Sequence, residues 1–389
     1  MTLELFEVRP ESLTEFIRLP YSIYPKDGRY VPQLERELKK ELSPRENPFF
    51  RHAEAKYFLA ARDGRPAGRV AAVVNLLHNE FHGERAGFFG FFECREDPEE
   101  AAALLGAAAG ELRRKGMEVM RGPMSFSTNE ECGLLVEGFE HPPALMTPYN
   151  PPYYAGLLEG FGLRKAKDLY AFAYDIGGSL PEKMLRAAAI AQGREGVTVR
   201  PIRKDRFAEE MEAFREIYNS AWARNWGFVP LTEEEVLFKG KLLKSIVVPA
   251  LTLIAEKDGE PVGFLGLLPD MNRVLWHMRG KMNPVTLVKA LYHSRRVRDL
   301  RLLLLGIKPG FRTRGVDALL YREAFGAARK LGYERAEFSW ILEDNEAMLR
   351  IIALMNARLY RKFRIYEMPL TGGLPQHEHG VDPAEAEGV

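Results

Sequence analysis

The sequence repeats one pattern, and this repeat constrains the fold more than any other feature. Residues 59–68 read Leu-Ala-Ala-Arg-Asp-Gly-Arg-Pro-Ala-Gly, and residues 254–263 read Ile-Ala-Glu-Lys-Asp-Gly-Glu-Pro-Val-Gly. Each segment has an apolar run, an Asp-Gly pair, a proline and the start of another apolar run, which is typical of a β-hairpin. Two such hairpins predict that one structural unit occurs twice.

Two further pairs of segments follow the hairpins in the same order. Residues 104–116 and 319–332 are rich in alanine and leucine and stop at a glycine, as helices that lead into a strand do. Residues 168–170 and 364–366 match as closing strands. We therefore expect a tandem duplication of an α/β unit. The expected division is a first unit over 1–176, a linker with a short helix over 177–196, a second unit over 197–370, and a disordered polar tail over 371–389.

The second unit contains a short basic loop between an apolar strand and a helix. The strand ends at Ile307, the loop reads Lys-Pro-Gly-Phe-Arg-Thr-Arg-Gly, and the helix begins at Val316. Such a loop presents backbone N–H groups and a helix N-terminus to a phosphate.

This segment resembles the acyl-CoA pyrophosphate loop of the GCN5-related N-acetyltransferase (GNAT) superfamily, whose pattern is Arg/Gln-x-x-Gly-x-Gly/Ala. Arg312 and Gly315 take the first two places, and Asp317 stands where the family has glycine or alanine. The resemblance implies two GNAT-like folds, each a mixed, mostly antiparallel sheet with helices on both faces and a splay between two parallel strands. It also implies acetyl-CoA as cofactor. The residues expected to bind it are Ile307, Phe311, Arg312, Thr313, Arg314, Gly315 and Val316.

At the equivalent place the first unit reads Phe-Phe-Glu-Cys-Arg-Glu-Asp-Pro-Glu-Glu over residues 91–100. It lacks the Arg-x-x-Gly pattern, and its carboxylates would repel a pyrophosphate. We expect this unit to be a degenerate copy that binds no CoA in the usual mode.

Two unusual stretches are candidates for the acceptor side. One is a long loop over 122–154 in the first unit, and the other is the aromatic segment 218–230 in the second. Loops of this length in a compact domain are usually functional, and indole and amide donors beside flat apolar faces suit a polar small molecule or a peptide end. We expect the long loop to pack across the domain junction and line a pocket, with purely structural packing as the alternative. For the aromatic segment the alternative is a clamp that holds the loop. The expected acceptor residues are Tyr218, Trp222, Asn225, Trp226, Asn129 and Tyr149.

Transfer from a thioester to an amine also needs a base, an oxyanion donor and an acid. Glu343, at the end of a predicted strand, is our candidate base, and Asn345 matches an asparagine that the superfamily places at the next helix start. A backbone N–H near Leu305 to Ile307 would stabilise the oxyanion. The tyrosine acid of many GNAT enzymes is missing, because Ile351 or Leu354 takes its place.

A third stretch, residues 271–299, is an insertion in the second unit with seven basic residues and one acid. It contains an amphipathic helix candidate over 284–298. It is either a solvated cover for the sheet or a basic wall for an anionic ligand.

Composition limits the partners. The formal net charge of +1 gives no overall attraction to nucleic acid or membrane, and no apolar run approaches the ~20 residues of a bilayer span. The start of the chain lacks signal-peptide features, and two cysteines fit a reducing cytoplasm. We expect a cytoplasmic monomer or homodimer with no metal site.

Three hypotheses remain. The first is an N-acetyltransferase acting on a small amine or peptide amine. The second is a tandem-fold aminoacyl-transferase that uses aminoacyl-tRNA. The third is a non-catalytic module that binds CoA or a metabolite.

Overall fold

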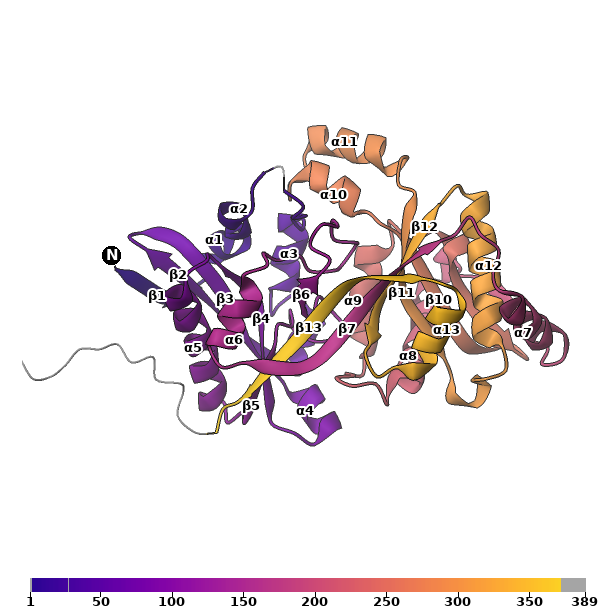
Figure 1. Ribbon diagram of the computed structural model, residues 1–389, viewed down its shortest axis with the longest axis horizontal. Helices are drawn as coiled ribbons and strands as arrows, with labels where there is room; N and C mark the ends of the chain where they lie inside the picture. The colour runs from indigo at the N-terminus through magenta and orange to yellow at the C-terminus, as the bar shows by residue number, and fades with distance from the viewer. Residues whose placement is uncertain (1, 27, 372–389) are drawn as a thin grey trace, which may run out of the picture.

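The computed structural model describes residues 2–26 and 28–371 and contains a single continuous sheet flanked by helices (Figure 1). The strands are β1 Leu3–Glu7, β2 Ala53–Arg62, β3 Arg65–Asn75, β4 Ala86–Cys94, β5 Val119–Gly122, β6 Leu134–Glu137, β7 Arg164–Asp175, β8 Thr198–Pro201, β9 Thr252–Lys257, β10 Glu260–Pro269, β11 Asp299–Ile307, β12 Arg335–Leu342 and β13 Arg358–Pro369. The α-helices are α1 Leu13–Arg18, α2 Pro20–Ile23, α3 Glu35–Glu41, α4 Leu76–His82, α5 Pro98–Arg114, α6 Tyr154–Gly160, α7 Glu182–Gly193, α8 Phe207–Trp222, α9 Glu233–Leu243, α10 Asn272–Met278, α11 Pro284–Ser294, α12 Val316–Lys330 and α13 Glu346–Leu354.

The two predicted hairpins are present and have the same turn. Asp63 and Gly64 between β2 and β3, and Asp258 and Gly259 between β9 and β10, all have positive φ, from 52° to 84°. Two successive residues with positive φ make the turn that suits the twist of paired strands. The internal repeat is therefore a repeat of local backbone geometry as well as of sequence.

The predicted mixed sheet with a parallel strand pair in each half is confirmed. Strand β4 runs parallel to β5, and β11 runs parallel to β12; the other named strand pairs are antiparallel. The ladder between β11 and β12 covers only Asp299–Leu302 and Arg335–Phe338. Beyond Leu302 these two strands diverge, and this splay opens the second half of the sheet.

The closing strands are exchanged between the halves, which the repeat alone did not reveal. The strand order is β1-β2-β3-β4-β5-β13-β7-β12-β11-β10-β9-β8. The last strand of the first half, β7, pairs with β12, and the last strand of the chain, β13, pairs with β5. Both strands cross the middle of the molecule (Figure 1). Sequence boundaries at residues 176 and 370 therefore do not divide the sheet into two separate sheets.

Side chains that alternate along β10 pack against different helices on the two faces of the sheet. Leu265 and Leu267 belong to the core beneath α12, whereas Phe264 packs in the cluster formed with α8 and α9. Successive residues of a strand point to opposite faces, so helices cover both faces of the second half. The expected disordered tail lies, except for residue 371, outside the described residues.

Candidate functional site

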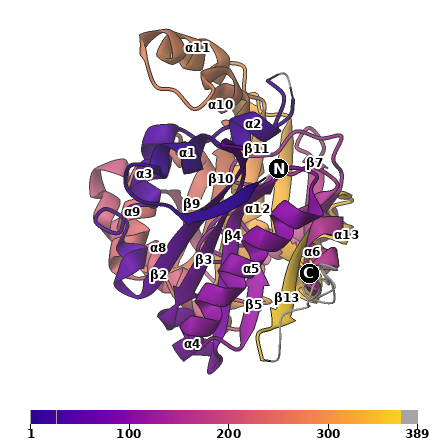
Figure 2. The ribbon, with the colours of Figure 1, turned by 90° about the vertical axis from the view of Figure 1, so that its left-hand side faces the viewer.

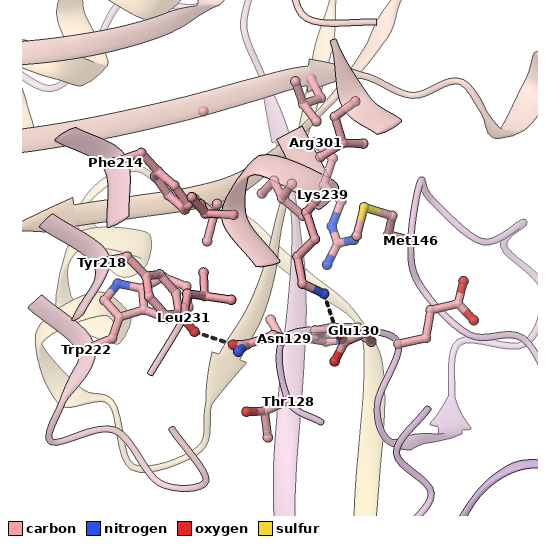
Figure 3. Close-up of a pocket in the computed structure, with 18 of the residues that line it drawn as sticks. Thr128, Asn129, Glu130, Met146, Phe214, Tyr218, Trp222, Leu231, Lys239 and Arg301 are labelled. Carbon is pink, nitrogen blue, oxygen red and sulfur yellow. Dashed lines mark hydrogen bonds and ion pairs between the residues drawn. The ribbon is translucent and has the colours of Figure 1, made fainter. Parts of the chain in front are cut away.

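A cavity of about 430 Å³ lies where the second half meets the long loop of the first half (Figure 3). Its walls come from β10, β11 and β12, from helices α8, α9 and α13, and from residues 125–132 of the first half. Most of these walls are apolar. Examples are Phe214, Leu303, Leu304, Ile341 and Met348.

The cavity is lined by residues of β11 and β12 that lie beyond the end of their shared ladder, such as Leu304 and Ile341. Gly266 pairs with Leu304 and Leu267 pairs with Leu302, so Leu303 has no partner residue in β10. The indole N–H of Trp222 donates to the carbonyl oxygen of Leu305 at 3.1 Å. The N–H and C=O groups of one strand residue point to the same edge. The N–H of Leu305 is therefore also directed away from β10, on the splayed side.

The two halves are joined at the cavity by hydrogen bonds between the long loop and the aromatic segment. The hydroxyl of Tyr218 donates to Oδ1 of Asn129, whose Nδ2 donates to the carbonyl of Val229 at 3.2 Å (Figure 3). The hydroxyl of Thr128 donates to the carbonyl of Gly227 at 2.6 Å. The expectation that the long loop packs across the junction and lines a pocket is confirmed.

Three carboxylates from the first half border the cavity. Glu130 forms an ion pair with Lys239 of α9 (Figure 3), and Glu131 accepts a hydrogen bond from Gln33 at 3.0 Å. Glu41 has no side-chain partner among the residues that the structure describes. Burial raises the pKa of Glu41 from 4.5 to about 7, because an apolar surrounding disfavours the charged form.

A buried charge network closes one end of the cavity. Arg301, which lines the cavity, donates to Ser339 Oγ at 3.0 Å and to the carbonyl of Leu145. Glu337 accepts from Arg361 at 2.6 Å and from the hydroxyl groups of Ser339 and Tyr360. Burial lowers the pKa of Arg301. The network ties β11, β12 and β13 to the long loop, and sequence reasoning missed it because its members lie far apart in the chain.

Five of the six expected acceptor residues lie on the cavity wall. They are Asn129, Tyr218, Trp222, Asn225 and Trp226. Tyr149 does not; its carbonyl accepts a hydrogen bond from the Tyr24 hydroxyl at 3.1 Å, and its ring packs against Tyr24. The order of residues in the long loop gave no sign of which aromatic side chains turn away from the junction.

The two expected catalytic residues have different surroundings. Glu343 pairs with Lys165 at 2.6 Å and accepts from the backbone N–H of Asp168 at 3.1 Å. It is not among the cavity-lining residues. Asn345 does line the cavity and caps α13 by accepting from the N–H of Met348 at 3.2 Å. Glu41, Glu130 and Glu131, rather than Glu343, are therefore the carboxylates that border the cavity, and Glu41 is the one without a side-chain partner among the described residues.

The expected phosphate loop keeps the predicted strand–loop–helix shape, but several of its side chains have other partners. Arg312 donates to the carbonyl of Ala221 at the end of α8, and Arg314 pairs with Glu195 at 3.0 Å. Ile307 ends β11, and Thr313 Oγ1 donates to the carbonyl of Arg312 at 2.6 Å.

Helix α7 of the linker gives Gly315 a role that the sequence did not suggest. A Cβ atom on Gly315 would lie 2.2 Å from the carbonyl oxygen of Ala187, and the φ of Gly315 is +78°. The glycine is therefore required by the close approach of α7, a reason that differs from the cofactor binding expected from the resemblance. Val316, the first residue of α12, is buried in the core, and the first turn of α12 has no side-chain cap.

The corresponding helix start in the first half satisfies its own N–H groups. Asp97 caps α5 by accepting from the N–H groups of Glu99 at 2.9 Å and Glu100 at 3.2 Å. Glu100 is fully buried and pairs with Arg62 and Arg95. Asp97 and Glu100 thus have structural partners.

Neither a metal site nor a bilayer-spanning helix is present in the described part of the chain. No group of three or more His, Cys, Asp or Glu side chains in that part of the chain could hold a metal ion. No helix there has the length and apolar character of a bilayer span. Cys132 lines the cavity, and burial raises the pKa of its thiol to about 12.

Comparison with known proteins agrees with this architecture. The profile of the Acetyltransferase (GNAT) family matches residues 211–356. Protein YghO of Escherichia coli (strain K12) is 38% identical over 366 residues, which cover 91% of this chain and 92% of the relative. Bacterial ceramide synthase of Caulobacter vibrioides (strain NA1000 / CB15N) is 36% identical over 374 residues, which cover 93% of this chain and 96% of the relative.

Solved structures share the fold at low identity. A tandem GNAT protein from the clavulanic acid biosynthesis pathway superposes with a TM-score of 0.56 at 12% identity, covering 96% of this chain and 100% of that one. A GCN5-related N-acetyltransferase from Sphaerobacter thermophilus gives a TM-score of 0.51 at 13% identity, covering 95% and 96%. Together with the two relatives, these matches show that the chain belongs to the GNAT acyltransferase family and has the tandem GNAT fold.

Proposed function

We propose that this chain is an N-acyltransferase that moves a long-chain acyl group from an acyl-CoA thioester to the amine of a long-chain amino alcohol. The product would be an amide of the ceramide type. The proposal replaces the acetyl group and small amine of our first hypothesis with a fatty acyl group and a lipid amine. Sequence similarity to the bacterial ceramide synthase over 93% of the chain supports this choice.

The observation that carries the proposal is the apolar cavity at the strand splay. An acetyl group has two carbons, whereas the cavity measures about 430 Å³ and has Phe214, Leu303, Leu304, Ile341 and Met348 in its walls. Burying each methylene of an acyl chain in such walls contributes about 0.8 kcal/mol. A cavity of this size and character therefore favours a long chain over an acetyl group.

The residues around the splay supply two of the groups that amide formation needs, an oxyanion donor and a base. In this proposal the N–H of Leu305 donates to the thioester carbonyl oxygen as negative charge develops there. Glu41, with a pKa of about 7, is matched to accept a proton from the amine near neutral pH. Asn129, Tyr218 and Lys239 provide polar contacts for the hydroxyl groups of an amino alcohol.

The loop between β11 and α12 remains our proposed anchor for the CoA phosphates. The uncapped first turn of α12 offers backbone N–H groups to an anion. Lys308 pairs with Glu216 at 2.5 Å and Arg314 pairs with Glu195, and both pairs are partly exposed. An incoming phosphate can recruit these cations at small cost, because exposed ion pairs contribute only about 0–1 kcal/mol.

The test is a chain-length series. Purified protein is incubated with sphinganine and, separately, acetyl-, octanoyl- or palmitoyl-CoA, and the amide product is quantified by mass spectrometry. We expect kcat/KM to rise by at least tenfold from acetyl- to palmitoyl-CoA. Highest activity with acetyl-CoA would overturn the long-chain assignment and restore acetyl transfer.

Two other outcomes separate the remaining hypotheses. Binding of palmitoyl-CoA without amide formation from any amine would indicate a non-catalytic binding module. Transfer from aminoacyl-tRNA, with no binding of any acyl-CoA, would indicate an aminoacyl-transferase. Either result contradicts the proposal.

A further inference from the structure

The insertion between β10 and β11 forms a helical hairpin that stands away from the body of the molecule. It consists of α10, Asn272–Met278, and α11, Pro284–Ser294. Figures 1 and 2 show α11 at the outer edge of the structure, with α10 between it and the sheet. The hairpin leads directly into β11, one of the strands that line the cavity.

The outward face of α11 is apolar and exposed. Val288 is 70% exposed, Val285 66% and Leu291 59%, and Leu287 and Tyr292 are each more than half exposed. At 100° per residue these side chains, with Pro284, form one continuous apolar arc on a single side of the helix. Monomeric proteins rarely leave such a concentrated apolar surface in water.

The inner face of α11 is packed, so the exposed arc belongs to a folded helix in a defined orientation. Thr286 is buried, and Ala290 packs against the small core formed by Val274, Met278 and Val297. The ring of His293 stacks on that of His277 at 3.5 Å between centroids. An Asn283–Thr286 capping box fixes the start of the helix.

The hairpin that carries the apolar arc is rich in basic residues, and most of them have no acidic ion-pair partner among the described residues. Residues 271–298 contain seven basic residues and no Asp or Glu. Within the described residues, Arg273 pairs with Asp299, whereas the other six basic side chains form no ion pair. These six are Arg279, Lys281, Lys289, Arg295, Arg296 and Arg298. Arg296 also lies over the ring of Tyr292, 4.0 Å from its centroid, at the border between charge and apolar surface.

We propose that the α10–α11 hairpin docks the protein on an anionic lipid bilayer. The axis of α11 lies in the plane of the surface, with Val285, Val288 and Leu291 among the upper acyl carbons and the basic side chains at the phosphate groups. An apolar helix face bordered by Lys and Arg is the pattern of helices that lie in a membrane interface. This inference does not depend on the proposed reaction.

Charge argues against a second copy of this chain as the occupant. A twofold dimer through α11 would place the same surface of each copy against the other. It would therefore bring the six unpaired cations of one hairpin toward those of the other, which is unfavourable. Anionic headgroups complement both the apolar arc and its charged border.

The inference revises our expectation that no membrane is involved. That expectation rested on the lack of a long apolar run and on the net charge of +1, which averages over the whole chain. The unpaired positive charge is concentrated on the projecting α10–α11 hairpin. A bilayer surface would contact this hairpin, so the local charge matters more than the net charge of the whole chain.

The test is flotation of the full chain with vesicles of phosphatidylcholine alone or mixed with phosphatidylglycerol. We expect binding to the mixed vesicles, weakened at least tenfold by V285E/V288E and weakened by raised salt. The matched control is L76E/L331E, which adds the same charge at residues that are 55% and 50% exposed on other surfaces. R295Q/R296Q is expected to lower the preference for phosphatidylglycerol while leaving the melting temperature unchanged.

Three results would overturn the proposal. One is absence of wild-type binding to the mixed vesicles. Another is equal loss of binding in L76E/L331E. The third is a wild-type dimer in light scattering that V285E/V288E converts to monomer without any change in vesicle binding, because it would assign the apolar arc to self-association.

Discussion

Replacing Glu337 with alanine should destabilise the protein far more than removing an exposed carboxylate. Glu337 is the carboxylate of the network that holds Arg301 and Arg361, each only 1% exposed. Its oxygens lie 2.6 Å from Arg361 and 3.8 Å from Arg301. The variant leaves two buried guanidinium groups without this partner, and removing one member of a buried ion pair costs about 3–5 kcal/mol.

A loss of this size is large against the whole stability of a folded protein, which is about 5–15 kcal/mol. Urea denaturation followed by tryptophan fluorescence measures it, with Glu343→Ala as the control. Glu343 pairs with Lys165, which is 41% exposed, and such surface pairs contribute about 0–1 kcal/mol. Equal effects of Glu337→Ala and Glu343→Ala would refute the reasoning that burial makes the network important.

Three further predictions concern single groups. Since burial raises the pKa of Glu41 to about 7, folding favours its protonated form, so stability falls as pH rises from 4.5 to 7. Glu41→Gln should remove this pH dependence and raise the unfolding free energy at pH 8 by up to about 3 kcal/mol. The same variant should lower kcat, and an unchanged kcat would contradict the proposed role of Glu41 as the base. Gly315→Ala should lower the unfolding free energy by about 1–3 kcal/mol, because the new methyl group would clash with Ala187. The variant should also speed amide hydrogen exchange in α7, and unchanged exchange would contradict that contact. Cys132 should react with a thiol reagent at pH 8 only after unfolding, and rapid reaction of the folded protein would contradict its burial.

The sequence was sufficient to predict the repeated unit because hairpin turns, helix ends and strand patterns are local. Asp63-Gly64 and Asp258-Gly259 demand the same backbone geometry wherever they occur. The exchange of β7 and β13 could not be predicted in the same way. Either strand can complete either half, and the choice depends on long-range packing that no local pattern records.

The site was predictable in part for a related reason. Trp222, Trp226 and Asn129 attracted notice as aromatic and amide residues in unusual loops, and they do meet at the cavity. Glu41 and Arg301 were missed as cavity residues because their properties come from burial, which the sequence does not show. Gly315 was singled out by the loop pattern, but its neighbour in the structure is a helix of the linker, whose position that pattern does not specify.

The most direct test of the account is to narrow the cavity and follow chain-length preference. Leu303 lines the splay and has no partner in β10, so Leu303→Trp should reduce the space with little loss of sheet pairing. Met348→Trp provides an independent version from α13. We predict that both variants retain transfer from short acyl-CoA and lose transfer from palmitoyl-CoA by at least tenfold. Folded variants that use palmitoyl-CoA as well as the wild type would contradict the assignment of this cavity to the acyl chain.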